Sequence, residues 1–334
     1  MKGRTLADVG ELELVERILD KLGPLDEGVR VGPGDDAAVL AIGGSVVLTT
    51  DSQHEGVHYR PEWIAPEVLG RRSIAVNASD LGAMGARPRG FLVALALTAS
   101  TELDWVVSLA GGLREGAARF GAVVLGGDVA AVADRVSINV TAVGEIDEAT
   151  EPVERGGAAP GTRCFVTGWP GRAAAGRRVL QAGDPPSAAF EACVDAFLDP
   201  RPPVAFGGIA ARRGLVGAMI DISDGLAIDL GRMCSASGVG ARLDAASLVT
   251  DPVLGAVAAG LSLDPVELVL GGGEDYELLC SVADESAEAF CALAADEEIE
   301  VRDVGRFVAA GEGVTLVRDG HVEPVAHGGW DHFA

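Results

Sequence analysis

The chain has 334 residues, which favours two domains, because single hydrophobic cores stop growing at about 250–300 residues. Hydrophobic residues make up 48% of the chain and aromatic residues only 4%, which indicates globular cores packed from Ala, Val and Leu. The formal net charge of −24 argues against nucleic acid or an anionic membrane as a partner, because both require a basic surface.

The sequence also argues against several common site types. No apolar stretch approaches the roughly 20 residues of a membrane span, and the start of the chain lacks a signal-peptide pattern, so we expect a cytoplasmic protein. The five cysteines show no C-x-x-C spacing, and their odd number fits reduced thiols. Lys2 and Lys21 are the only lysines, and no P-loop motif is present. Any nucleotide site must therefore use metals, arginine and backbone amides.

The first half of the chain alternates helical and strand patterns. Apolar spacing predicts helices over 11–22, 66–86 and 102–120, and strands over 36–40, 45–50, 91–97, 122–125 and 136–146. The turn at 42–44 joins the first two of these strands. The segment 147–161 is acidic and then rich in Gly, Ala and Pro, which is typical of a domain boundary.

The second half repeats this alternation. Strands are predicted over 163–168, 218–222, 277–282, 301–308 and 314–318, and helices over 172–183, 187–198, 203–213, 225–237 and 286–297. Because both halves mix helices with non-adjacent strands, we predict two α/β domains with mixed sheets, over 1–149 and 150–334.

Acidic residues gather in short motifs, most of which are bordered by glycine or serine. These motifs are Gly34-Asp35-Asp36, Thr50-Asp51, Asn77-Ala78-Ser79-Asp80, Gly126-Gly127-Asp128, Asp221-Ile222-Ser223-Asp224-Gly225 and Gly272-Gly273-Glu274-Asp275. Several follow apolar runs, and strand ends are where open α/β sheets bind ligands. Converging carboxylates repel one another unless hard cations neutralise them, and oxygen ligands suit Mg²⁺. The pattern predicts a magnesium–phosphate enzyme.

Four acidic or hydroxyl residues of the first half are candidate metal ligands. Asp51, after an apolar strand, would be a costly inward carboxylate unless a metal bound it, and Thr50 can offer an oxygen to the same ion. Asp80 lies three residues after Asn77, so both face one side of a helix. Asp36 follows a glycine-rich turn that admits a ligand. Turn capping and hydrogen bonding in the core are the alternatives.

Glycines beside the next acidic residue suggest a phosphate site. Gly126 and Gly127 carry no side chains and leave room for a phosphate next to Asp128, although turn geometry alone also explains them.

The motif beginning at Asp221 is the sharpest of the set. Asp221 and Ser223 alternate onto one strand face, and Asp224 lies at the start of the next helix, where capping alone would explain it. Helix N-termini favour anions, so Ser223 and nearby amides can hold a phosphate while the two aspartates hold ions. Glu274 follows three glycines that admit a bulky group beside it.

Three further residues carry weaker signals. His58 lies near Asp51, but a lone histidine is more often structural, and its carboxylate surroundings give little support for zinc. Arg155 is either a surface charge or a phosphate clamp. Trp330, near the end of the chain, either packs the tail down or stacks on a planar ligand.

In their order and spacing, these motifs resemble the thiamine-monophosphate kinase family, in a superfamily that also holds aminoimidazole ribonucleotide synthetase and selenophosphate synthetase. The resemblance extends from Gly10 to the aromatic tail around Trp330 and is most specific in the segments 34–39, 77–86, 222–226 and 272–278. It implies ATP-dependent phosphorylation of thiamine monophosphate to thiamine diphosphate. It also implies a homodimer formed through the strands of an N-terminal ATP- and magnesium-binding domain, with a C-terminal domain that completes the site.

The resemblance also implies roles for single residues. Several Mg²⁺ ions are expected on Asp36, Thr50, Asp51, Asp80, Asp128, Asp221 and Asp224, of which Asp128, Asp221 and Asp224 are the expected catalytic residues. ATP contacts are expected from Ser223, Arg155 and Gly127, and contacts to the thiamine phosphate from His58, Glu274 and Trp330.

One position departs from the family pattern. The family usually follows Gly-Gly-Asp with a pair of hydroxyl residues, whereas Val129 and Ala130 follow here, so a hydroxyl contact to phosphate at this turn is in doubt. Two other interpretations stay open. One is another ATP-dependent enzyme of the superfamily, such as a ribonucleotide synthetase, and the other is a non-catalytic nucleotide or metal binder. A selenophosphate synthetase is disfavoured because no cysteine precedes Cys164.

Overall fold

The computed structural model describes residues 4–25, 28–33, 37–183 and 188–325. The chain divides into two compact units, which are a mixture of helices and mixed sheets, so the predicted α/β class is confirmed. The N-terminal unit comprises residues 1–81 and 86–149, and the C-terminal unit comprises residues 82–85 and 150–334.

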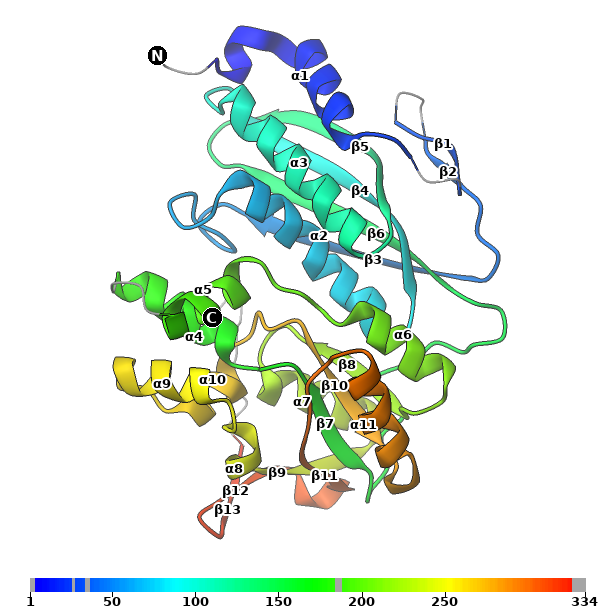
Figure 1. Ribbon diagram of the computed structural model, residues 1–334, viewed down its shortest axis with the longest axis vertical. Helices are drawn as coiled ribbons and strands as arrows, with labels where there is room; N and C mark the ends of the chain where they lie inside the picture. The colour runs from blue at the N-terminus through cyan, green and yellow to red at the C-terminus, as the bar shows by residue number, and fades with distance from the viewer. Residues whose placement is uncertain (1–3, 26–27, 34–36, 184–187, 326–334) are drawn as a thin grey trace. The chain divides into compact units, whose positions relative to one another are not determined.

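The N-terminal unit is built on a four-stranded sheet (Figure 1). Its elements in chain order are α1 (Leu6–Leu22), β1 (Val29–Val31), β2 (Val39–Leu40), β3 (Ser45–His54), α2 (Pro66–Ala83), β4 (Arg87–Thr98), α3 (Leu103–Arg119), β5 (Val123–Val132) and β6 (Ser137–Ile146). The strand order is β3-β6-β4-β5, with β4 and β5 parallel and the other pairs antiparallel. Strands β1 and β2 form a separate two-stranded sheet.

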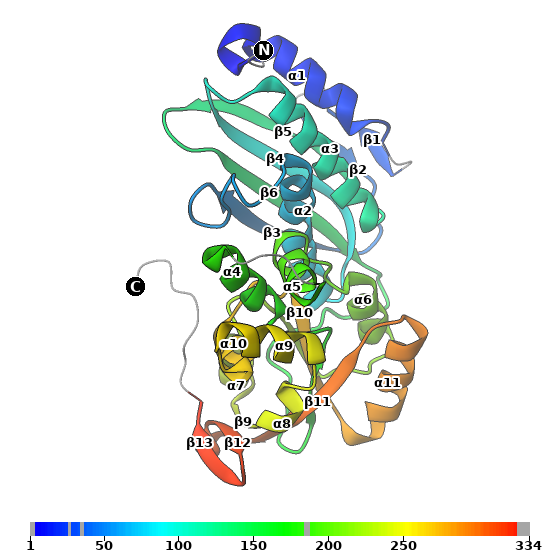
Figure 2. The same cartoon turned by 60° about the vertical axis from the view of Figure 1, so that its left-hand side comes forward.

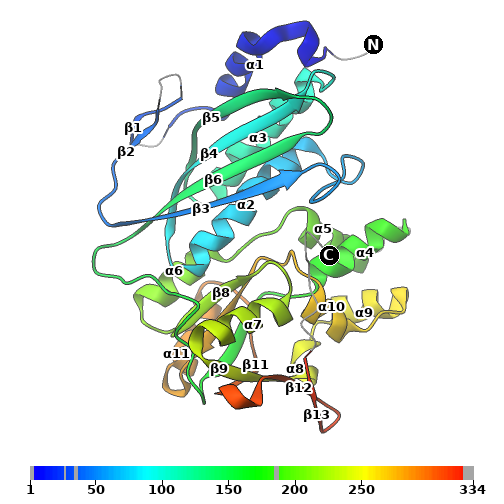
Figure 3. The same ribbon diagram turned by 180° about the vertical axis from the view of Figure 1, so that it is seen from behind.

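Helices α2 and α3 cover one face of the four-stranded sheet, and Figure 3 shows the opposite face with no helix in front of it. Strand β6 alternates fully and partly buried residues along its whole length, as expected when one face packs on a core and the other does not. Val46, Leu48 and Leu92 are large apolar side chains that remain exposed in this unit.

The strand expected over 45–50 is longer than predicted and has a different partner. Strand β3 runs from Ser45 to His54 because it pairs with β6 along its whole length, from Ser45 opposite Ile146 to His54 opposite Ser137. Strand β2 pairs with β1 instead, so the turn at 42–44 joins two strands that do not pair with each other.

The C-terminal unit contains a seven-stranded sheet with the order β13-β12-β9-β11-β7-β10-β8. Its strands are β7 (Arg163–Thr167), β8 (Ala218–Ile222), β9 (Val239–Asp244), β10 (Glu277–Val282), β11 (Val301–Ala309), β12 (Val314–Arg318) and β13 (His321–Pro324). Its helices are α4 (Arg172–Ala182), α5 (Ala188–Leu198), α6 (Val204–Arg212), α7 (Leu226–Ser237), α8 (Ala245–Leu248), α9 (Pro252–Leu261), α10 (Pro265–Gly271) and α11 (Ala287–Asp296), with 3₁₀ turns at Asp284–Ser286 and Ala310–Glu312.

Two hydrophobic cores lie on the two faces of this sheet. Alternate residues of one strand enter different cores, as Leu279 joins the cluster that includes α7 and α10, while Leu278 joins the cluster of α6 and α11. Figure 2 shows α6 and α11 on one side of the strands and α7 and α10 on the other. Burial on both faces explains why these strands are continuous apolar runs in the sequence.

Strand β9 and the helices α8 to α10 were not predicted. Each of the three helices is short, but its N-cap is an aspartate, Asp244, Asp251 or Asp264, whose side chain accepts a backbone N–H two residues later. A proline follows Asp251 and Asp264 directly, and Asp-Pro at a helix start was the available signal. No single helix among the described residues is long and apolar enough to cross a membrane, and only the bent pair α9–α10 passes that test jointly.

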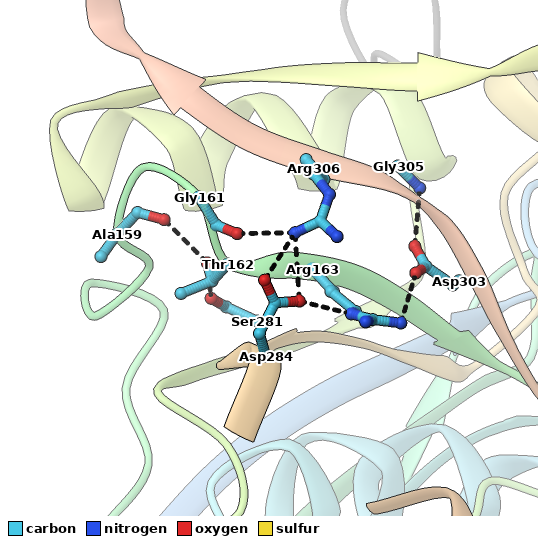
Figure 4. A network of polar contacts seen from close by, with 9 residues as sticks. All are labelled: Ala159, Gly161, Thr162, Arg163, Ser281, Asp284, Asp303, Gly305 and Arg306. Atoms are coloured by element: carbon cyan, nitrogen blue, oxygen red, sulfur yellow. Dashed lines mark hydrogen bonds and ion pairs between the residues drawn. The ribbon is translucent and has the colours of Figure 1, made fainter. Parts of the chain in front are cut away.

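A network of ion pairs connects strands β7 and β11 with the turn after β10 (Figure 4). Arg163 donates from Nε to Asp284 at 2.6 Å, and Arg306 donates from Nη1 to the same carboxylate at 3.2 Å. Asp303 accepts from Arg163 and from the backbone of Gly305, at the point where the β11–β7 register shifts. These charges are exposed, so the network contributes to local order rather than to a buried site.

Candidate active site

In the N-terminal unit, α2 presents polar side chains to strand β3. Asp80 accepts a hydrogen bond from the Thr49 hydroxyl at 2.6 Å, and the Asn77 carbonyl oxygen accepts from the backbone N–H of Asp51 at 2.9 Å. The Asn77 amide in turn donates to the backbone oxygen of Ser73 within α2 at 3.0 Å. Asn77 and Asp80 therefore both face β3, as their spacing requires.

Asp51 does not sit where the sequence suggested. It lies inside β3 rather than after it, and its side chain is exposed, so the expected burial of an inward carboxylate is wrong. The cause is the position of β3 at the edge of the sheet. Thr50, one residue earlier, points to the other face, where its hydroxyl donates to the Val140 carbonyl at 3.0 Å. The hydroxyl of Thr50 and the carboxylate of Asp51 thus lie on opposite faces.

His58 lies just beyond β3 and is held by it. Its Nδ1 accepts from the backbone N–H of His54 at 3.1 Å, and the two imidazole rings lie 5.4 Å apart between centroids. The His54 Nδ1 is 2.8 Å from the hydroxyl of Ser137 on β6. These contacts leave His58 partly exposed at the end of the strand that carries Asp51.

Asp128 likewise lies inside a strand, exposed in the middle of β5. Gly126, with φ +151°, makes a bulge in the β4–β5 register, and the strand continues past it instead of ending. A Cβ on Gly127 would lie 1.8 Å from the Val93 carbonyl oxygen, so close strand packing already requires this glycine. Phosphate binding is therefore not needed to explain the two glycines.

A cavity of about 730 Å³ opens beside this strand, within the N-terminal unit. Its walls are mostly apolar and come from α1, residues 32–33 and 37–40, and strands β4, β5 and β6, while Asp128, Asn139 and Thr141 supply polar groups. Its volume lies within the range of about 300–1,000 Å³ of small-molecule sites.

In the C-terminal unit, Asp221 lies in β8 with only 7% of its surface exposed, and Ser223 and Asp224 follow in the turn before α7. Asp224 is not the N-cap residue of α7. That position is taken by Gly225, which has no side chain to cap the helix. Instead, the buried Asp229 accepts the backbone N–H groups of both Ser223 and Asp224 at 3.0 Å. The Asp229 carboxylate, in the first turn of α7, thus fixes the backbone of Ser223 and Asp224.

An arginine neutralises these two carboxylates. Nη1 of Arg232 lies 2.6 Å from Asp224 and 2.7 Å from Asp229. Burial raises the pKa of Asp229, and its backbone hydrogen bonds and Arg232 oppose that rise. Arg232 also lines an open hollow of about 500 Å³ together with Arg155. Two arginines from separate segments of the C-terminal unit therefore line one hollow, and one of them, Arg232, also pairs with Asp224.

The 271–276 segment packs against the same turn. Glu274 donates its backbone N–H to the Ser223 carbonyl at 2.7 Å, and Tyr276 donates to Ile222 at 2.8 Å. Between them, Asp275 is buried and turned toward α4, and burial raises its pKa to about 8, against the backbone N–H bonds that it accepts. The backbone at Glu274 therefore lies directly against the turn that follows Asp221.

Sequence reasoning missed three residues of this region: Asp229, Arg232 and Asp275. The first two are spaced i, i+3 within a predicted helix, which is a recognisable ion-pair spacing. Asp275 lies in the acidic motif 272–275. Its contact with Gly171, 104 residues earlier, cannot be read from the neighbouring sequence. Two predicted site residues, Asp36 and Trp330, lie outside the described residues.

The donor chemistry of both units suits a hard cation. Asp51 and Asp80 in one unit, and Asp221 and Asp224 in the other, offer only oxygen ligands, as Mg²⁺ prefers. Over the described ranges, no three or more His, Cys, Asp or Glu side chains are already grouped to hold a metal ion. The metal roles of these residues therefore stay predictions.

Comparison with known proteins identifies the family. Residues 34–146 match the model of the AIR synthase related protein N-terminal domain, and residues 170–318 match its C-terminal domain. Thiamine-monophosphate kinase of Mycobacterium tuberculosis is 40% identical over 278 residues, covering 82% of this chain and 81% of that protein. The chain belongs to the thiamine-monophosphate kinase family.

Further relatives agree with this assignment. The Salmonella typhimurium thiamine-monophosphate kinase is 34% identical over 330 residues, 97% of this chain and 98% of that one. The crystal structure of thiamine-monophosphate kinase from Stenotrophomonas maltophilia has a TM-score of 0.81 at 32% identity, covering 93% of this chain and 97% of that one. A structure named AaThiL complexed with AMPPCP and TMP has a TM-score of 0.77 at 29% identity and covers 100% of both chains.

The family resemblance inferred from the motifs is confirmed, and the chain is an enzyme of the kinase class. The hydrogenase maturation protein HypE in complex with ATP, at 20% identity and a TM-score of 0.77, shares the fold. The roles of single site residues and the expected dimer remain predictions.

Proposed function

We propose that this enzyme transfers the γ-phosphoryl group of ATP to thiamine monophosphate, giving thiamine diphosphate and ADP. The observation that carries the proposal is the match to AaThiL complexed with AMPPCP and TMP, because it extends over 100% of both chains. The acidic, oxygen-only side chains of both units supply what such a reaction needs.

The acceptor group determines which catalytic groups are required. A phosphate monoester has a second pKa of about 6, so the acceptor oxygen is already ionised near neutral pH and needs no strong general base. This accords with a chain that has no lysine after Lys21 and a single expected histidine, His58, at the site. Orientation and charge neutralisation then account for most of the catalysis.

The transfer is a direct in-line step. An oxygen of the thiamine phosphate forms a bond to the γ-phosphorus of ATP, and the bond from that phosphorus to the β–γ bridging oxygen breaks, so ADP leaves with the electron pair. No phosphorylated side chain is formed. A radiolabelled phosphoenzyme trapped after incubation with ATP alone would contradict this step.

Several Mg²⁺ ions are the expected cofactor, and when bound they would supply charge neutralisation between the two polyanions. The side chains that would hold them are Asp51, Asp80 and Asp128 in the N-terminal unit and Asp221 and Asp224 in the C-terminal unit. Thr50 would contribute through its backbone oxygen, since its hydroxyl faces away from Asp51. Asp36 completes the proposed set.

Substrate contacts are assigned to the remaining site residues. Ser223 and Arg155 would hold the phosphates of ATP, with Arg155 acting from the hollow it shares with Arg232. Gly127, where only a small residue fits, would let the nucleotide approach β5 closely. The thiamine phosphate would be held by His58, Glu274 and Trp330.

A homodimer is proposed through the uncovered face of the N-terminal sheet. Leu48 is 66% exposed and Val46 51% exposed on β3, and Leu92 on β4 adds to an apolar surface that no described helix covers. Light scattering of Leu48→Asp should show monomer where the parent shows dimer. A parent that is monomeric at micromolar concentration would contradict this assignment.

The experiment that tests the function is chromatographic detection of thiamine diphosphate after incubation with thiamine monophosphate, ATP and Mg²⁺. Free thiamine serves as a parallel acceptor. We expect product from the monophosphate only, because the site is proposed to recognise an ionised phosphate acceptor. ATP binding without any product from the monophosphate would refute the proposal, and product from free thiamine would refute its acceptor specificity.

A further inference from the structure

The segment 271–276 has a backbone geometry that its own residues do not favour. Glu274 and Tyr276 have φ values of +67° and +53°, in the left-handed region that residues with a Cβ rarely adopt. Gly273 shares this conformation, and a Cβ there would lie 2.7 Å from the Ser223 carbonyl oxygen. Such strain persists only where the surroundings over-determine the backbone, and it clusters at functional sites.

Two groups of contacts hold the strained backbone in place. The N–H groups of Glu274 and Tyr276 bond to the 222–223 carbonyls, and this fixes one side of the segment. The residue between them, Asp275, fixes the other side. Asp275 is only 9% exposed, and its side chain contacts the start of α4 at Gly171.

Asp275 acts as the missing cap of α4. Its Oδ1 accepts from the backbone N–H groups of Gly171 at 2.9 Å and Ala173 at 3.3 Å, and its Oδ2 also lies 2.9 Å from the Gly171 nitrogen. The N-cap residue of α4 is Gly171 itself, which has no side chain to offer. The orphan N–H groups at a helix N-terminus favour a side-chain oxygen acceptor, so this contact ties the segment to a regular element.

We propose that Asp275 is a positioning residue that, by capping α4, holds the left-handed backbone that presents Glu274 to the thiamine phosphate. The inference rests on the proposed function and deepens it. Asp275 itself touches no substrate in this account. It restricts the conformations of Glu274 before the substrate binds. Less of the binding energy of thiamine monophosphate is then spent on ordering the 271–276 segment.

A purely structural cap would behave differently, and the chain contains a matched control. Asp264 caps α10 in the same unit, with Oδ1 accepting from the backbone N–H of Val266 at 2.9 Å. Asp264→Asn keeps an acceptor at the N-terminus of α10, a helix length from the 272–276 backbone, and removes a carboxylate that pairs with the exposed Arg318. Asp275→Asn keeps the shape of the side chain, but its amide group faces the Gly171 N–H, so one acceptor is replaced by a donor.

The test is a double-mutant cycle read by calorimetric binding of thiamine monophosphate to the full-length protein at about pH 9, above the pKa of about 8 at which Asp275 becomes a carboxylate with two acceptor oxygens. We expect Asp275→Asn to weaken binding about 10-fold, because small misplacements of a binding group are costly. Asp264→Asn should stay within about twofold of the parent, as a remote site does. In a Glu274→Gln background, Asp275→Asn should add less than about twofold, because it acts through a carboxylate that is no longer there.

Three results would overturn the positioning role. They are unchanged binding in Asp275→Asn, an equal loss in Asp264→Asn, and full additivity with Glu274→Gln. If Asp275→Asn does not fold, as judged by circular dichroism, Asp275→Ser takes its place, since a hydroxyl can still cap a helix. A parent that does not bind thiamine monophosphate overturns the proposed function and this inference together. Normal parent binding with unaffected variants overturns only the inference.

Discussion

The two units hold their acidic side chains in different ways. In the N-terminal unit, the neutral hydroxyl of Thr49 donates to the Asp80 carboxylate, and the Asn77 amide oxygen accepts from the backbone N–H of Asp51. In the C-terminal unit, one guanidinium, that of Arg232, pairs with both Asp224 and Asp229. The C-terminal unit therefore carries a cation of its own beside its acids, whereas the contacts just described for the N-terminal unit leave the negative charge in place.

The two units should therefore lose different amounts of unfolding free energy when the partners of their carboxylates are substituted. A hydrogen bond to a charged group contributes about 1.5–3 kcal/mol, and the low end applies where water can replace the donor, as at the partly buried Asp80. Removing the cation from a buried carboxylate leaves an uncompensated charge, which costs more. Substitutions of the partners should therefore separate the two units more clearly than substitutions of the acids themselves.

The largest effect should come from the acid nearest the built-in cation. Asp224→Asn should lower kcat/KM by about 100-fold, the size of loss typical when a preorganised electrostatic contact is removed. Steady-state assays of thiamine diphosphate formation measure it. Asp244→Asn, which removes a helix-capping carboxylate in the same unit, is the control and should keep nearly full activity. Parent-like kinetics in Asp224→Asn would rule out its role.

A stability measurement tests the cation directly. Arg232→Gln should lower the free energy of unfolding by about 1–3 kcal/mol, less than a fully buried pair would lose, because Arg232 is partly exposed while Asp229 is buried. The matched control is Arg242→Gln, whose pair with Glu312 is exposed on both sides and should lose less than about 1 kcal/mol. Equal losses in urea unfolding would mean that the C-terminal cation has no special role.

The buried Asp275 should make the free energy of unfolding depend on pH. The pKa of Asp275 rises from its ordinary value of 3.8 to about 8 on folding, mainly through burial. The unfolded chain thus releases this proton near pH 4, while the folded chain keeps it until about pH 8. The contribution of Asp275 to stability therefore falls as pH rises between these values, by at most about 1.4 kcal/mol per pH unit.

Urea unfolding of the parent and of Asp275→Asn between pH 5 and 8 isolates this contribution. The parent should lose stability relative to the variant as pH rises. A stability difference that stays constant across this range would show that Asp275 does not take up a proton on folding.

The smallest effect should be in the N-terminal unit. Thr49→Val removes the hydroxyl that donates to Asp80 and should cost about 1.5 kcal/mol of unfolding free energy, the low end for a bond to a charged group, because Asp80 is only partly buried. Urea unfolding measures it. A loss above about 2 kcal/mol would place this bond in the same class as the charged contacts of the C-terminal unit and would remove the distinction between the units.

Much of the fold could be predicted, because its signals are local. Helices α3 and α7 and strand β8 follow apolar spacing that depends on neighbours in the sequence. The lengths of β3 and β5 could not be predicted, since they are set by pairing with β6 and β4. For that reason the sequence pattern predicts Asp51 and Asp128 at strand ends, whereas both lie inside strands.

The candidate site divides in the same way. The motif around Asp221 and Ser223 was found because glycine, serine and aspartate mark it locally. The ion pairs of Arg232 and the capping role of Asp275 depend on where the chain returns in space. Asp275 contacts Gly171, 104 residues earlier, and no spacing rule connects two such positions.

The central proposal is that phosphoryl transfer depends on Mg²⁺ and on Asp80 and Asp224. The most direct test is a Mg²⁺ titration of thiamine diphosphate formation by the parent, Asp80→Asn and Asp224→Asn, with Asp244→Asn as control. The account predicts that both site variants require more Mg²⁺ and turn over more slowly, while the control matches the parent. Parent-like Mg²⁺ dependence in either site variant would contradict the claim for that unit.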